Sequence, residues 1–452
     1  MNDNKQIYIF SQLNEEALTL AHSVPSPAVM QFTGLDGSSV QNHPLSLTCE
    51  KLGYTLITKN IIRHLSESDN SLPKKVILIN RDEEKNLQDA MAVNQLYASC
   101  SQYELYCFCS TTESECIIDN MNQRNFTEYL QPMKLRRVLP IRNEVYHYLQ
   151  THSPFSSAHS IRGERWINIV ILGMNHYGLE MWKALLWFCQ MEGYFLRLDV
   201  FDVSSDLEDR LGEECPGILE RNGIPRIGED YYDIHFYPDT NYSSRSFYQK
   251  LSRLPQTSWV ITDTGSDRTN FDLAIKLRRH YSGMQIDQGQ LPEHLPESIQ
   301  TPKIVSVIHD DYLSSLLNNN QLCNFRGQCY QIEAIGQNTS AFSYQSLFDD
   351  TLEKQAFEMH IRWFPAQEFE MFEYFRRSSI ASLLHLPYRT TLCDSKESAA
   401  ITEHRRWCAY MRSTEGYTYG IARDDLARRH PSLTAFDNLS QIEKKKDEVM
   451  NN

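Results

Sequence analysis

The chain has 452 residues, more than one ordinary hydrophobic core accommodates, so two to four domains are expected. Hydrophobic residues make up 41% and charged residues 23%, which are the proportions of a folded globular protein. The formal net charge of -14 disfavours binding to nucleic acid and to anionic membrane surfaces.

The N-terminal stretch Met1 to Phe10 has an early lysine but lacks the apolar segment and cleavage site of a signal peptide. No apolar run approaches the ~20 residues of a membrane span, so a cytoplasmic protein is expected. The 11 cysteines include no CxxC pair and no zinc-type spacing, and no metal site is predicted. Cys107 and Cys109 alternate along an expected strand and so share one face. The cysteines are expected to be buried free thiols of a reducing compartment.

The first part of the chain alternates short apolar strands with helices. Strands are expected at Ile7–Phe10, Ala28–Phe32, Val76–Ile79 and Tyr103–Cys109, and helices at Asn14–Ala21 and about Asp82–Ala98. This alternation is typical of a parallel, doubly wound sheet. Residues 130–154 are expected to form a connector ending in a helix, followed by a polar linker over residues 152–160.

The strand–helix pattern then restarts. A buried strand at Ile167–Leu172 precedes a helix at Leu179–Gln190 and a strand at Phe195–Phe201. From residue 399 onward the pattern is helical. The expected fold class is therefore α/β, with two tandem doubly wound Rossmann-like domains followed by a small, mainly helical domain. Domain ranges of 1–153, 160–365 and 366–452 are expected.

The two α/β halves resemble each other in one segment. Residues 77–86 and 261–270 each run from an apolar strand through an acidic turn to an asparagine, Asn86 or Asn270. A helix follows, with Ala90 or Ala274 four residues later. The match indicates an internal duplication, with chance recurrence of a strand–turn–helix as the alternative.

The turn after the strand at Ile167–Leu172 reads Gly173-Met-Asn-His-Tyr-Gly178. Gly173 permits a tight turn and Gly178 close helix packing, so the first helical N–H groups would face an anion. Asn175 stands where the dinucleotide fingerprint has glycine, and its Cβ would crowd a pyrophosphate. Asp202 ends the next strand, where an acid normally holds a ribose diol. A nucleotide cleft and a relic of the fold are the two interpretations.

The first half lacks such a loop. Its first turn, Phe10 to Glu16, contains no glycine. The two glutamates at the start of the helix interact favourably with the helix dipole but would repel a phosphate. This copy is expected to be a packing or dimerisation partner, which implies a homo-oligomer formed through the Rossmann-like domains.

The Gly173–Gly178 loop, Asp202 and the segment Thr264–Arg279 together resemble the NAD-binding regulatory domains of potassium transport proteins, of the TrkA-N or RCK type. The resemblance covers roughly residues 165 to 330. It implies NAD(H) or a related adenine nucleotide as cofactor and adds Asp267 and Asn270 to the cleft. The alternative is that both residues only cap the helix that begins there.

The C-terminal stretch carries the most specific pattern. Its elements are Glu403-His-Arg-Arg-Trp407, Glu415-Gly-Tyr-Thr-Tyr-Gly420, Arg423-Asp-Asp, His430-Pro-Ser-Leu433, Leu439 and Lys446-Asp447. Their order and spacing resemble the ryanodine-receptor (RyR) repeat over residues 399 to 452. The resemblance implies a ligand-binding domain, and bacterial proteins of this kind are associated with nucleotide signalling, conflict or antiviral defence.

Chemistry agrees with a nucleotide-derived ligand in this stretch, because purines stack on aromatic rings and guanidinium groups bind phosphate. The candidate side chains are His404, Arg405, Trp407, Tyr417, Tyr419 and Arg423. The helix around Tyr374–Ala381 resembles one that precedes the RyR core, which adds Arg377 and Ser378 near the phosphate. The alternative is that the aromatic rings only fill the core of a small domain.

No catalytic pattern is present: the chain has no GxSxG elbow, HExxH helix or Walker loop, and no catalytic residues are assigned. A nucleotide-sensing regulatory protein is therefore the main hypothesis, and a role as an enzyme is disfavoured. The alternatives are an NAD-dependent oxidoreductase or nucleotide-processing enzyme, and a regulatory subunit of an ion-transport system.

Overall fold

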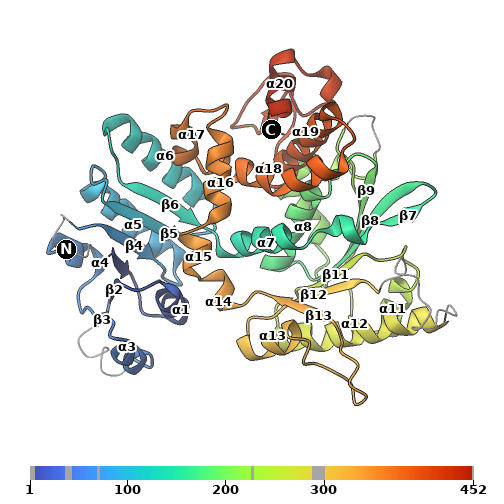
Figure 1. Cartoon of the computed structure of the whole chain (residues 1–452), viewed down its shortest axis with the longest axis horizontal. Coiled ribbons are helices and arrows are strands. Elements are labelled where there is room, and N and C mark those ends of the chain that lie inside the picture. The colour runs from blue at the N-terminus through green and yellow to red at the C-terminus, as the bar shows by residue number, and fades with distance from the viewer. Residues whose placement is uncertain (1–5, 36–42, 69–71, 225–228, 288–300, 450–452) are drawn as a thin grey trace. The chain divides into compact units, whose positions relative to one another are not determined.

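The computed structural model describes residues 6–35, 43–68, 72–224, 229–287 and 301–449, and the chain forms two compact units (Figure 1). Unit 1 comprises Met1–Asn143 and Asn338–Ser379, and unit 2 comprises Glu144–Gln337 and Ile380–Asn452. This division differs from the three consecutive domains expected, because the chain returns to its first unit after completing the second sheet.

Unit 1 is built on a six-stranded parallel sheet with the order β3-β2-β1-β4-β5-β6. Its strands are β1 (Gln6–Phe10), β2 (Ala28–Phe32), β3 (Thr55–Leu56), β4 (Lys74–Leu78), β5 (Tyr103–Phe108) and β6 (Lys134–Val138). Its helices include α1 (Glu15–Ser23), α3 (Ser46–Leu52), α4 (Ile61–Ser66), α5 (Glu83–Tyr97) and α6 (Thr112–Glu128). Side-chain caps begin several of them, with Asn14, Asp82 and Thr111 each accepting a hydrogen bond from a first-turn amide.

Alternate residues of this sheet fill two separate cores, because successive strand side chains point to opposite faces. Tyr8 and Phe10 lie in one core, and Ile9 lies in the other. The returning segment contributes α14 (Asn338–Ala341), α15 (Tyr344–Leu347), α16 (Thr351–His360) and α17 (Ala366–Met371). Phe348, just after α15, packs on Tyr8 and Tyr106 with ring centroids 5.5 and 4.7 Å away. Residues 338–379 therefore complete the first core.

Unit 2 repeats the strand order, as β10-β9-β8-β11-β12-β13, with β7 antiparallel to β8. Its strands are β7 (His159–Ile161), β8 (Glu164–Leu172), β9 (Tyr194–Phe201), β10 (Asp233–Tyr237), β11 (Trp259–Thr262), β12 (Lys303–Val307) and β13 (Ile332–Ile335). Its helices include α8 (His176–Phe188), α9 (Leu207–Glu214), α10 (Pro216–Leu219), α11 (Arg245–Leu251), α12 (Asp267–Asp287) and α13 (Asp311–Asn318). The shared order agrees with the predicted duplication, and the two parallel sheets confirm the α/β fold class.

The C-terminal region is mainly helical and packs within unit 2. The long helix α18 (Glu373–Leu392) leads into it, followed by α19 (Lys396–Ser413), the two-residue strands β14 (Thr418–Tyr419) and β15 (Arg429–His430), and α20 (Gln441–Val449). Helix α19 lies against α8, and α20 lies against α19 (Figure 1). Because α8 is covered by the sheet on one side and by α19 on the other, its Trp182 and Trp187 are fully buried.

Three expectations need correction. Residues 130–154 contain the strand β6 as well as the helix α7 (Pro140–Thr151), and the supposed linker contains a 3-10 turn (Pro154–Ser157) and the start of β7. The basic run Lys134–Val138 concealed β6, whose arginines pair with acids in unit 1. The cysteines are not uniformly buried, because Cys116, Cys323 and Cys329 are exposed.

None of the helices in the described ranges is long and apolar enough to cross a membrane.

Candidate functional site

The turn between β8 and α8 has the conformation that its glycines predict. Gly173 has a φ of +90°, and a Cβ there would lie 2.1 Å from the backbone oxygen of Asp263. A Cβ on Gly178 would lie 2.4 Å from the backbone oxygen of Gly173. Only glycine fits at either position, so the tight approach of strand, turn and helix that nucleotide-binding sheets use is present here.

A carboxylate of the chain itself lies at the start of α8. The Gly178 amide donates to Asp263 Oδ2 over 2.8 Å, and the Asn175 side chain donates to the Asp263 backbone oxygen over 2.6 Å. Burial raises the pKa of Asp263, although the amides of Gly178 and Gly265 donate to it. The position at the start of α8 where a bound anion was expected is thus occupied by the carboxyl group of Asp263.

Asp202 is also engaged within the protein. The Met174 amide donates to its Oδ2 and the Ser204 amide to its Oδ1, each over 2.7 Å. The residue is 7% exposed. Both oxygens thus hold the Gly173 turn and the end of β9 in place, at the position where a ribose diol was expected to bind.

Asp267 and Asn270 join the ends of β11 and β12. The Asn270 side chain accepts from the Thr264 amide at 2.8 Å and donates to the Val307 oxygen at 2.9 Å. Asp267 Oδ2 accepts from the amides of His309 and Asp310 at 3.0 and 2.7 Å. These contacts differ from the helix caps of the alternative interpretation, because their partners are at the ends of neighbouring strands and not in the first turn of α12.

Unit 1 contains the same arrangement, with an acid and an asparagine three residues apart. The Asn86 side chain accepts from the Asn80 amide at 2.7 Å and donates to the Phe108 oxygen at 2.8 Å. Glu83 Oε2 accepts from the Ser110 amide at 2.9 Å. The repeat of an acid and an asparagine at matching strand ends identifies this pair as part of the duplicated framework.

The first turn of unit 1 is closed by side chains instead of glycines. The Ile79 amide donates to Ser11 Oγ at 2.9 Å, and Asn14 Nδ2 donates to the Ile79 oxygen at 2.8 Å. Asn14 also caps α1 through the Ala17 amide. These contacts fill the turn, in agreement with the expectation that this copy lacks the nucleotide loop.

The C-terminal region brings aromatic rings together around His430. The Trp407 ring meets His430 edge-on with centroids 5.1 Å apart, and the Tyr417 ring lies 6.5 Å from it. Trp407 and Tyr417 are both partly exposed, whereas His430 is 8% exposed. We call Trp407, Tyr417 and His430 the aromatic cluster. His430 lies in the sequence pattern but was not among the expected ligand residues.

His404 supports this cluster from beneath. Its ring stacks near Trp407, with centroids 5.8 Å apart, and its Nε2 lies 2.8 Å from the Thr434 oxygen. Burial lowers the pKa of His404, but Cys408 and the Asp447 carboxylate outweigh burial and hold the pKa well above its ordinary value. His404 is 2% exposed and its ring packs against the Trp407 ring, so it supports Trp407 without itself facing solvent.

The expected arginines are not all brought to the cluster. Arg423 is exposed and donates to Asp425, which also accepts from the Tyr417 hydroxyl at 3.0 Å. Arg405 is two residues from Trp407 on α19, about 200° around the helix. Burial lowers its pKa, with Glu192 and Asp230 acting against that shift. Arg405 therefore lies on a different face from the aromatic cluster.

Tyr419 is 54% exposed and pairs through its backbone with His430 in the short β14–β15 ladder. Its backbone oxygen accepts from the Arg429 side chain at 3.1 Å. Tyr419 thus lies at the edge of the aromatic cluster, close in sequence to the exposed loop that carries Arg423.

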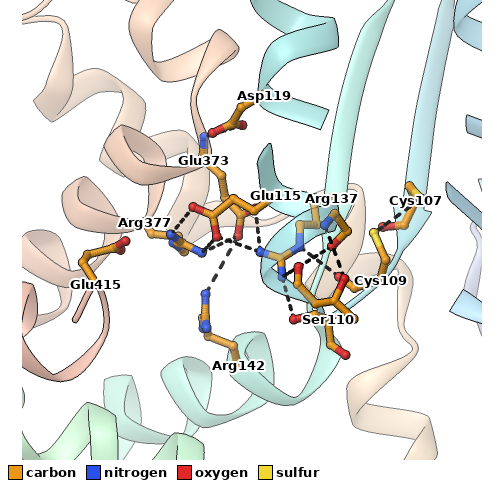
Figure 2. Close-up of polar contacts among 12 residues, drawn as sticks. Cys107, Cys109, Ser110, Glu115, Asp119, Arg137, Arg142, Glu373, Arg377 and Glu415 are labelled. Carbon is orange, nitrogen blue, oxygen red and sulfur yellow. Dashed lines mark hydrogen bonds and ion pairs between the residues drawn. The ribbon is translucent and has the colours of Figure 1, made fainter. Parts of the chain in front are cut away.

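Arg377 lies in a buried ion network of unit 1, shown in Figure 2. It pairs with Glu115 and Glu373 at 2.9 Å each, and Arg137 pairs with the same two acids at 3.1 Å each. Arg137 also donates to three backbone oxygens after β5. Arg377 therefore joins α18 to α6 directly, and to β6 through the two acids that it shares with Arg137. Ser378 beside it is partly buried.

Two residues of these sites were missed by sequence reasoning. Asp263 directly follows β11, so its place at the sheet edge was predictable, but its side chain's contact with Gly178 depends on how the strands pack. His430 was visible within the His-Pro-Ser-Leu pattern. Among the described residues, no group of three or more His, Cys, Asp or Glu side chains forms a metal site.

No protein-family model matches the chain, and no curated protein sequence matches it. Among solved structures, the GsuK RCK domain aligns with a TM-score of 0.41 and 11% identity, covering 78% of this chain and 78% of that one. GsuK bound to ADP aligns with a TM-score of 0.43 and 11% identity, covering 77% and 71%. The GsuK channel bound to NAD aligns with a TM-score of 0.42 and 10% identity, covering 78% and 66%. The α/β assignment itself rests on the order of the strands.

Proposed function

We propose that the chain is a nucleotide-responsive regulatory protein that binds a nucleotide-derived ligand at the aromatic cluster. The observation that supports this is the placement of two partly exposed rings, Trp407 and Tyr417, around His430. The exposed guanidinium of Arg423 donates a hydrogen bond to Asp425, and the Tyr417 hydroxyl donates to the same carboxylate. A base stacks on such rings, and a guanidinium binds phosphate.

The proposal for the second sheet is conditional on a rearrangement. NAD(H) or a related adenine nucleotide would place its pyrophosphate where Asp263 accepts from Gly178. Its ribose would compete with the two amides that now donate to Asp202. We therefore assign the nucleotide-derived ligand to the aromatic cluster. NAD binding at the Gly173 turn is assigned to a state in which the Asp263 side chain has turned away from Gly178.

The wider setting of the proposal rests on sequence resemblance. We propose that ligand binding is read out by a homo-oligomer formed through the two sheets, and that the regulated process is bacterial antiviral defence. The support for this setting is the sequence pattern over residues 399–452, together with the shared strand order of the two sheets.

The test compares the whole chain with two leucine variants. NAD, NADH, ATP, ADP-ribose and cyclic nucleotides are screened by thermal shift, and affinities are then measured by calorimetry. Trp407→Leu should weaken the nucleotide that binds by about 5- to 150-fold, the effect of losing one base stack. Trp166→Leu is the matched control, since Trp166 is also partly exposed and stacks on a ring, Phe195, elsewhere in unit 2.

Three results would count against the proposal. Unchanged affinity in Trp407→Leu would place the ligand elsewhere. A loss of stability of about 3–5 kcal/mol in the same variant, with no nucleotide bound by the wild-type chain, would make Trp407 a core residue only. Turnover of NAD or ATP by the wild-type chain would favour the enzyme alternative.

A further inference from the structure

A narrow hairpin joins α13 to the edge strand β13 in unit 2. The Asn324 amide donates to the Gln328 oxygen at 2.9 Å, and the Tyr330 amide donates to the Leu322 oxygen at 3.0 Å. The turn between them is held by the Asn324 side chain, which accepts from two amides of the turn at 2.9 and 3.1 Å. Gly327 supplies a φ of +78° there. The two arms are thus in fixed register.

Cys323 and Cys329 face each other across this hairpin. They form an antiparallel bridge pair that lies between the two hydrogen-bonded pairs, so they are the non-hydrogen-bonded partners of the ladder. Such partners have Cα atoms about 4.5 Å apart, within the range of about 4.4–6.8 Å that a disulfide spans.

The two thiols also point to the same side. Cys329 Sγ lies 3.1 Å and Cys323 Sγ 3.6 Å from one acceptor, the backbone oxygen of Asn320. Both residues are exposed. A small oxidant therefore reaches either sulfur, and each sulfur lies beside the other without any change of register.

We propose that Cys323 and Cys329 form a reversible disulfide across this hairpin, with low-molecular-weight disulfides as the oxidant. One cysteine thiolate attacks the small disulfide and releases one small thiol, leaving a mixed disulfide on the protein. The second cysteine thiolate then attacks the protein sulfur and releases the second small thiol. The two cysteines lose two electrons and two protons in total, and the small disulfide is reduced to two thiols.

The other cysteines provide internal contrasts. Cys116 is exposed on α6 and has no cysteine opposite it in the described residues, so it can stop only at the mixed disulfide. Cys107 and Cys109 have sulfurs 3.5 Å apart but are buried, at 0% and 3% exposure, and no oxidant reaches them. Fixed proximity together with exposure thus distinguishes the hairpin pair.

The oxidation has a local structural consequence. The Asn320 oxygen loses both S–H donors when the disulfide forms. Asn320 and Gln331, at the base of the hairpin, have φ values of 52° and 50° and both line a cavity of about 580 Å³ beside β13. Tyr148, Asn318 and Glu333 also line it. Disulfide formation thus changes the hydrogen bonding of Asn320, a residue that lines this cavity.

The experiment uses the wild-type chain in glutathione buffers of increasing oxidised fraction. Free thiols are blocked with iodoacetamide, and the protein is digested with trypsin without reduction. Arg326 lies between the two cysteines, so cleavage separates peptides 304–326 and 327–354, each with one cysteine. The expected product is these two peptides joined, appearing at a lower oxidised fraction than half-modification of Cys116 by glutathione. Adding excess reduced glutathione should separate them again.

A variant gives the second readout. Cys329→Ser should trap glutathione on Cys323, because the resolving thiol is absent, and the joined peptides should disappear. If the wild-type peptides remain individually alkylated, or each carries glutathione, at all oxidised fractions at which Cys116 is modified, the proposal is wrong.

Discussion

Asp263 and Gly178 are joined by a hydrogen bond of 2.8 Å that places a carboxylate of the chain at the amino end of α8. The amide that a phosphate would need is thereby satisfied internally. The partial positive charge of the helix terminus stabilises this carboxylate. The Gly178 amide at the start of α8 therefore has an acceptor within the protein itself.

Asp263→Ala should expose the anion position. We expect the free energy of unfolding to fall by about 1–3 kcal/mol, because buried amides lose their acceptor. Added sulfate should then raise the melting temperature of the variant by more than it raises that of the wild-type chain. Asp272→Ala is the control, since Asp272 is exposed on α12 and pairs with Lys276 one turn along the same helix. Equal sulfate effects in all three proteins would contradict the assignment.

The repeated asparagines should have matching energetic roles. Asn86→Ala and Asn270→Ala each remove a buried side chain that bonds a strand-end amide and a strand-end carbonyl. Each substitution should lower the free energy of unfolding by about 1–3 kcal/mol, measured by urea denaturation. Asn319→Ala, at an exposed position after α13, should change it by less than about 0.5 kcal/mol. A large loss at only one of the two buried asparagines would refute a shared structural role.

Glu403 should be essential for the packing of α18 on α19 in unit 2. It pairs with Arg389 at 2.9 Å and Arg406 at 2.8 Å, and all three are at most 2% exposed. Glu403→Gln removes the counter-charge that these two buried guanidinium groups share, which should cost about 3–5 kcal/mol at pH 7. Glu397→Gln, exposed on the same helix, is the control.

The same carboxylate predicts an acid dependence. Burial raises the pKa of Glu403, but the two arginines outweigh burial and lower it to about 2. Its contribution to stability is therefore complete above pH 4.5, the ordinary pKa, and is lost as the pH falls toward 2. The stability difference between wild type and Glu403→Gln should narrow over that interval. A difference independent of pH would show that the charge of Glu403 is not responsible.

Asp119 should give unit 1 a pH dependence near neutrality. Burial and the carboxylates of Glu373 and Glu115 raise its pKa to about 7, although the Glu373 amide donates to it at 3.1 Å and Arg376 lies nearby. The protonated form is favoured in the folded state, so this contribution to stability is lost as the pH rises from about 4 through 7. Asp119→Asn should therefore stabilise the chain at pH 8 by about 1 kcal/mol, a value discounted for partial exposure.

The control for this prediction is Glu113→Gln, at an exposed position on the same helix. Melting temperatures of both variants and the wild type are compared at about pH 6 and pH 8, on either side of the raised pKa. The stabilisation by Asp119→Asn should be smaller at the lower pH. A stabilisation of the same size at both pH values would indicate that ionisation of Asp119 is not involved.

Much of the framework was predictable from local pattern. Apolar runs located β1, β2, β4, β5, β8 and β9, and the glycines predicted the turn that Gly173 adopts at φ +90°. β6 was missed because its Lys and Arg side chains do not give the apolar pattern of a buried strand. Ion pairs with acids distant in sequence allow these side chains to be buried. Arg377 was expected near a phosphate; its pair with Glu373, one turn earlier in α18, follows helical spacing, but its pair with Glu115 of α6 spans 262 residues of sequence. Contacts of that range are set by packing, which no local spacing encodes.

The return of residues 338–379 to the first sheet has a consequence for synthesis of the protein. The face of β1 that carries Tyr8 leaves the ribosome long before Phe348, the ring that covers it. At about 5–20 residues per second, the whole of 144–337 is translated in the interval. Helix α1 packs on part of this face, but the part that residues 338–379 cover stays open on the nascent first sheet for tens of seconds and offers an apolar surface to a chaperone during translation.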